Sequence, residues 1–167
     1  MRAAYIMNRD KYFLISYYAI LFVDSKVYLP VQQAQAEQVP WGINAINALD
    51  VSDEYANNTK ICIVDSGYDL GHQDLPSTAT GAIITGQDNG VDLWYKDGSS
   101  GHGTHVAGII ASIAGNGKGG HGVIRNGRAN LHIIRVFNNE QQWVWNSFVR
   151  NAVSIACITY IDIIFHM

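Results

Sequence analysis

The chain has 167 residues, of which 48% are hydrophobic and 15% charged, so its composition excludes a disordered protein and its length predicts one domain. Its 11 basic and 14 acidic residues give a net charge of −3, which leaves no basic surplus to bind a nucleic acid backbone. Two cysteines are too few for a scaffold held together by disulfides.

Residues 12–23 (YFLISYYAILFV) form an uncharged apolar stretch with two interpretations. The stretch is too short for a transmembrane helix, which needs about 20 residues, but it suits the apolar part of a signal peptide. Its aromatic and β-branched side chains suit a strand of a pro-segment equally well. Both interpretations make residues 1–35 a signal peptide or the remnant of a pro-segment, with processing near Ala36. Both therefore predict a secreted protein.

The rest of the sequence alternates between strand and helix patterns. Strands are predicted where short apolar runs are rich in β-branched residues, at 60–65, 131–137 and 158–167. Helices are predicted where apolar residues recur at helical spacing or where a long run lacks charge, at 41–49, at 104–114 and from Asn146 onward. Residues 81–100 are rich in Gly, Asp and Asn, which predicts a surface loop. This order predicts an α/β protein with a parallel sheet covered by helices.

Two residues lie at positions where a parallel sheet typically carries its functional site. Asp65 ends a predicted strand, and His102 begins a predicted buried helix. Sites of open parallel sheets lie outside the carboxyl ends of the strands, so both side chains are positioned for one cleft. Taken singly, Asp65 suits a polar strand exit and His102 suits a capping or core histidine. Their combination favours a catalytic site.

The local sequences around both residues resemble a known family. Residues 63–67 (IVDSG) resemble the aspartate motif of the subtilisin-like serine proteases, and residues 102–108 (HGTHVAG) resemble the family's histidine motif at every position. The aspartate precedes the histidine, as it does in that family. The likeness extends from about Ala36 to Cys157. It implies a three-layer α/β/α fold with helices on both faces of the sheet, present here as a partial peptidase domain over residues 36–167.

The resemblance implies cleavage of peptide bonds by a Ser-His-Asp triad. His102 would take the proton from the serine hydroxyl and return it to the leaving amine, while Asp65 would orient the imidazole and stabilise its charge. The family's serine lies in a Gly-Thr-Ser-Met-Ala segment, which this sequence does not contain. We therefore expect a serine endopeptidase whose chain is truncated before its nucleophile and is inactive alone. The alternative is a non-catalytic truncated product that binds peptide or a partner.

The resemblance also implies a calcium site and a substrate groove. The family binds calcium through an aspartate nine positions after the catalytic one, which points to Asp74, with Glu37 and Asn116 as candidate partners. Phe137 and Trp145 would line the groove for substrate side chains. The ordinary interpretations are a solvated turn for Asp74 and core packing for Phe137.

Other motifs carry less weight. Residues 115–120 fit the dinucleotide fingerprint by letter but follow a helix instead of a strand, and His102 and His105 lack the glutamate of the zinc peptidase motif.

We expect a monomer that acts on polypeptides, with no nucleic acid partner and no stable membrane span. Cys62 and Cys157 are either bridged, which export permits, or two buried thiols.

Overall fold

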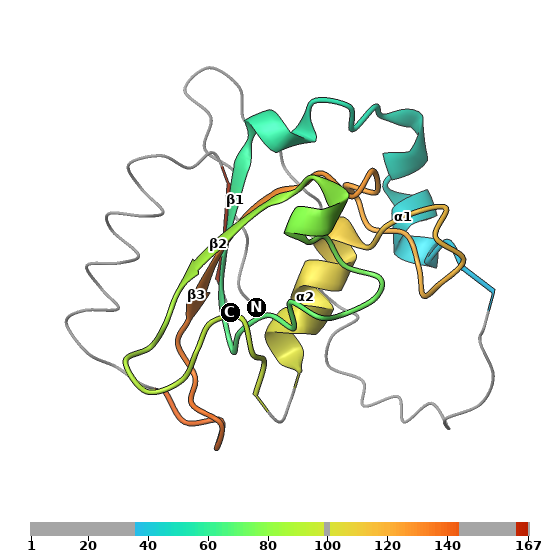
Figure 1. Ribbon diagram of the computed structural model, residues 1–167. Coiled ribbons are helices and arrows are strands. Elements are labelled where there is room, and N and C mark those ends of the chain that lie inside the picture. The colour runs from blue at the N-terminus through green and yellow to red at the C-terminus, as the bar shows by residue number, and fades with distance from the viewer. Residues whose placement is uncertain (1–35, 99–100, 144–162, 167) are drawn as a thin grey trace.

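The computed structural model describes residues 36–98, 101–143 and 163–166, which are coloured in Figure 1. For residues 163–166 only the backbone is described. The helices and strands follow in chain order: α1 (Trp41–Ala45), β1 (Lys60–Asp65), β2 (Ile83–Gln87), α2 (His102–Ala111), β3 (Asn130–Arg135) and β4 (Ile163–His166). Short 3₁₀ turns lie at Ala48–Asp50, Ala56–Asn58 and Thr78–Thr80.

The described strands form one parallel sheet in the order β2-β3-β1-β4. The strand β1 is therefore an inner strand, with β3 on one side and β4 on the other. Asp65 pairs in register with Arg135, so β1 and β3 end at the same edge of the sheet. That shared edge is the place where a parallel sheet presents a functional site.

The helix α2 lies along one face of the sheet, and α1 lies on the same side (Figure 1). Gly103, Ala107 and Ala111 are four residues apart, so they share one face of α2, and all three are buried. These small side chains let the helix approach β1 closely. Apolar side chains of the two inner strands complete this core: Ile61, Ile63, Leu131 and Ile133.

The parallel sheet predicted from the sequence is confirmed, and β1 has the predicted bounds. The helix expected over residues 41–49 ends at Ala45, because Asn47 adopts a left-handed conformation (φ 54°) and a 3₁₀ turn follows. The helix expected at 104–114 begins two residues earlier and ends at Ala111. The third predicted strand is present as β4.

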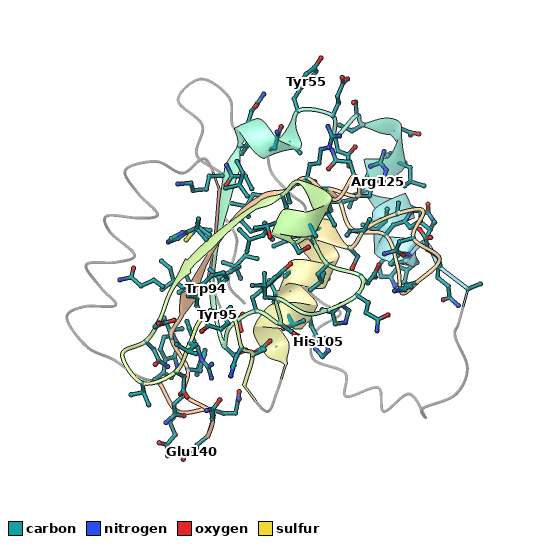
Figure 2. All side chains as sticks on the ribbon, viewed as in Figure 1. Tyr55, Trp94, Tyr95, His105, Arg125 and Glu140 are labelled. Carbon is teal, nitrogen blue, oxygen red and sulfur yellow. The ribbon has the colours of Figure 1, made fainter. Side chains whose placement is uncertain are left out.

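The prediction of a surface loop over residues 81–100 is wrong for its first part, which contains β2. Among the described strands, β2 pairs with β3 alone, and it lacks the long apolar run that is typical of an inner strand. Gly86 of β2 has a packing role, since a Cβ atom there would lie 2.3 Å from the ring of Trp94, which Figure 2 labels beside the sheet.

Several predictions concern residues outside those described: the segment 1–35, Trp145, Cys157 and the helix from Asn146. Cys62 is disulfide-bonded. Within the described residues, no helix is long and apolar enough to cross a membrane.

Candidate active site

Asp65 and His102 meet at the carboxyl end of β1. The Nδ1 atom of His102 lies 3.0 Å and 3.1 Å from the two carboxylate oxygens of Asp65. An ionised carboxylate only accepts hydrogen bonds, so Nδ1 carries the proton and Nε2 is the basic nitrogen of the neutral ring. Asp65 is 2% exposed and the His102 side chain 23% exposed. The pair therefore joins a buried acceptor to a histidine that solvent reaches.

The close approach of α2 to β1 brings the two residues together. A Cβ atom on Gly103 would lie 2.2 Å from the carbonyl oxygen of Gly67 and 3.2 Å from the Cβ atom of Asp65. Only glycine allows this contact. Because Gly103 follows His102 directly, the same contact sets the distance between the imidazole and the end of β1.

A buried arginine holds the loop beside the pair, and sequence reasoning missed it. Arg135 ends β3 and is 1% exposed. Its guanidinium donates to the carbonyl oxygens of Leu93 at 2.9 Å and Lys96 at 2.6 Å, and its Nε atom donates to the carbonyl oxygen of Phe137 at 2.9 Å. It donates further to the Asn139 side chain at 2.8 Å. The signal was available, since an arginine inside the apolar run LHIIRVF needs buried partners.

The predicted calcium ligands gather around the loop of residues 115–121. Asp74 is buried, and its Oδ1 atom accepts a hydrogen bond from the side-chain amide of Asn116 at 2.8 Å. Its Oδ2 atom accepts one from the Gly120 N–H at 3.0 Å. The loop therefore offers Asp74 hydrogen-bond donors.

Glu37 is held in the same way. Its carboxylate accepts the N–H groups of Gly115 at 2.6 Å and Gly117 at 2.9 Å, and the Nε2 atom of His121 lies 2.6 Å from Oε1. Both glycines have positive φ angles, which turn their N–H groups toward the carboxylate. These two N–H groups are the main cause of a lowered pKa of Glu37. We call Glu37 and residues 115–121 the N-terminal clasp.

Calcium takes six to eight oxygen ligands, whereas donors occupy the carboxylates of Glu37 and Asp74. As arranged, the two carboxylates accept hydrogen bonds from the loop of residues 115–121 and do not form a calcium site. Within the described residues, no group of three or more His, Cys, Asp or Glu side chains is arranged to hold a metal.

Phe137, predicted to line a substrate groove, follows β3 at the same edge of the sheet as Asp65. It forms an isolated antiparallel bridge with Trp143, and the two rings lie 4.5 Å apart between centroids. The buried side chain of Asn89 donates to the Phe137 carbonyl oxygen at 3.0 Å. Phe137 is half-buried, whereas Trp143 is exposed.

The fold and the site define an α/β protein with a parallel sheet and a histidine–aspartate pair at the carboxyl end of an inner strand. Residues 56–164 match the sequence model of the subtilase family, Peptidase_S8. The chain therefore belongs to the subtilase family.

Curated relatives and a solved structure are similar to this chain. Subtilisin E of Bacillus subtilis (strain 168) is 34% identical over 131 residues, which cover 77% of this chain and 32% of that protein. The major intracellular serine protease of the same organism is 32% identical over 136 residues, 80% of this chain and 41% of that protein. The crystal structure of the psychrophilic subtilisin-like protease Apa1 from the Antarctic psychrotroph Pseudoalteromonas sp. AS-11 superposes with a TM-score of 0.61. It is 41% identical and covers 72% of this chain and 28% of its own. This chain thus spans about a third of the length of subtilisin E.

Proposed function

We propose that this chain supplies the histidine and the aspartate of a serine endopeptidase that cleaves polypeptides. The observation that carries the proposal is the contact between Nδ1 of His102 and the buried carboxylate of Asp65. With its proton on Nδ1, His102 presents Nε2 as the base that takes the proton of a serine hydroxyl and later gives it to the leaving amine. Asp65 holds the ring in this tautomer and stabilises the imidazolium. The serine comes from outside the described residues.

The substrate chain would run past the carboxyl edge of the sheet. We propose Phe137 and Trp145 as groove residues that contact substrate side chains. Support comes from the position of Phe137, which follows the strand paired with β1 and lies two residues beyond the register partner of Asp65.

Replacing Asp65 by asparagine is expected to lower kcat about 10⁴-fold, the loss typical of a triad aspartate. The asparagine amide can donate to the imidazole, so it favours the tautomer with the proton on Nε2, where the base must be free. The longest reading frame that contains these residues is first sequenced and searched for a downstream Gly-Thr-Ser segment. Peptide hydrolysis by its product is then measured.

The matched control is His105→Gln. His105 lies on the same helix, is exposed and is labelled in Figure 2, and this variant should keep full activity. Unchanged hydrolysis by the Asp65→Asn protein would refute the triad. A reading frame that ends without a serine segment would favour the non-catalytic alternative.

The family resemblance implies calcium binding at Asp74, Glu37 and Asn116, whereas the hydrogen bonds to Glu37 and Asp74 argue against it, and melting experiments distinguish the two. Because N–H donors already satisfy both carboxylates, we expect the melting temperature of the full chain to be the same in calcium and in a chelator. Glu37→Gln should lower it equally in both conditions, whereas the exposed Glu54→Gln should not. A calcium-dependent rise in the wild type that Asp74→Asn abolishes would establish the calcium site.

We propose that the protein is exported. The disulfide at Cys62 supports export, since such bonds persist mainly in oxidising compartments. Cell fractionation of the native host tests this proposal. Recovery of the protein in the cytosol alone would refute it.

A further inference from the structure

The helix that begins with His102 has no cap of its own. Its N-cap residue is Gly101, which has no side chain to accept a hydrogen bond, and its first turn contains no acidic residue. The first N–H groups of a helix have no partner inside the helix and need one from outside. Here the N–H of Gly103 donates to the hydroxyl of Ser66 at 2.9 Å, and the N–H of Thr104 donates to Asp97 Oδ2 at 2.7 Å. Two other segments of the chain therefore cap α2.

The carboxylate of Asp97 joins these two caps. Its Oδ2 atom also accepts the hydroxyl of Thr104. Its Oδ1 atom accepts the hydroxyl of Ser66 at 2.7 Å and the N–H of Gly98 at 2.8 Å. A negative charge at this end of a helix interacts favourably with the helix dipole. The Asp97 carboxylate therefore accepts hydrogen bonds both from the first turn of α2 and from the residue that follows β1.

The residues that Asp97 holds are neighbours of the catalytic pair. Ser66 follows Asp65, and its N–H donates to Asp65 Oδ1 at 2.6 Å. Thr104 lies two residues after His102 in the first turn of the helix. One carboxylate therefore fixes the chain beside each member of the pair. The loop that carries Asp97 is itself held by Arg135, which binds the carbonyl oxygen of the preceding residue, Lys96.

We propose that Asp97 is a positioning residue, which sets the place and orientation of the His102 imidazole against Asp65 through Ser66 and the first turn of α2. This inference rests on the proposed function, since it concerns the geometry of the proposed triad. Asp97 acts on the histidine through the backbone and through hydroxyl groups.

The variant Asp97→Asn removes one of the two hydrogen bonds by which Asp97 joins Ser66 to Thr104. Asparagine has one carbonyl oxygen and one NH₂ group, so it can accept from Thr104 or from Ser66 but not from both. The other donor then faces an N–H group. The matched control is Asp88→Asn, because Asp88 lies in the same loop and accepts one backbone hydrogen bond, from the Trp94 N–H at 2.7 Å.

The experiment uses NMR on the full chain, with two measurements. Amide hydrogen exchange of Gly103 and Thr104 reports the caps directly, because neither N–H has an acceptor inside the helix. The signal of the His102 Nδ1 proton reports the contact with Asp65. In Asp97→Asn we expect about tenfold faster exchange at these two amides and a weakened Nδ1 proton signal. In Ser66→Ala we expect faster exchange at Gly103 with the same weakened signal. Asp88→Asn should match the wild type.

Wild-type exchange and an unchanged Nδ1 proton signal in Asp97→Asn would overturn the proposal, as would faster exchange with the signal intact. If Asp97→Asn does not fold, Ser66→Ala decides between the same two outcomes. Failure of the proposed function looks different. In that case Asp65→Asn leaves the Nδ1 proton signal unchanged, or the wild type shows none.

Discussion

Replacing Gly103 by alanine is expected to force α2 away from β1 and to lower the free energy of unfolding by about 3 kcal/mol or more. The added methyl group would lie 2.2 Å from the Gly67 carbonyl oxygen, and neither backbone can move without moving a core element. The Nδ1 contact of His102 with Asp65 should be lost with it. Thermal melting followed by circular dichroism measures the first effect, and NMR of the histidine ring measures the second.

The control for Gly103→Ala is Gly108→Ala on the same helix. A Cβ atom there has the Ser112 hydroxyl as its nearest atom, at 3.4 Å, which is ordinary contact. Alanine has the higher helix propensity, so this variant should be more stable than the wild type by about 0.5–1 kcal/mol. Equal melting temperatures for the two variants would contradict the packing argument.

Replacing Arg135 by methionine is expected to cost about 3–5 kcal/mol. Methionine fills much of the same space, but it leaves the Lys96 carbonyl oxygen without the guanidinium donor and the carbonyl oxygens of Leu93 and Phe137 with one donor each instead of two. Arg135→Lys should recover only part of the loss, because one ammonium group cannot reproduce the directions of a planar guanidinium. Chemical unfolding of the full chain measures both changes.

The exposed Arg128 provides the matched control for Arg135. Arg128→Met should change the free energy of unfolding by less than about 0.5 kcal/mol. A similar small change in Arg135→Met would show that the loop from Leu93 to Lys96 does not depend on the guanidinium.

The elements with strong local patterns could be predicted from the sequence. The run KICIVD predicts an inner strand because its four central residues are all apolar, and the helix after Gly101 follows from its long uncharged run. The strand β2 could not be predicted in the same way. Its residues are half-buried or exposed, and what makes them a strand is pairing with β3, far away in sequence.

The residues of the site also differ in how far the sequence predicts them. Asp65 and His102 could be predicted because each lies in a short motif at the end of an element. Asp97 could not, since only the fold brings Ser66, 31 residues away, to its carboxylate. For Arg135 the sequence shows that it needs buried partners, but not which carbonyl oxygens supply them. The gathering of residues around Asp74 followed the family resemblance, whereas the N–H groups that face its carboxylate depend on how the glycine loop turns.

The position of β4 in the sheet has a consequence for synthesis on the ribosome. Ile61 of β1 pairs with Ile163, about 100 residues later in the chain. At a translation rate of roughly 5–20 residues per second, β4 is synthesised on the order of 5–20 s after β1, and one edge of β1 has no partner strand until then. During that interval the nascent chain presents an apolar strand with unpaired N–H and C=O groups, which is the substrate that chaperones protect from association with neighbouring chains.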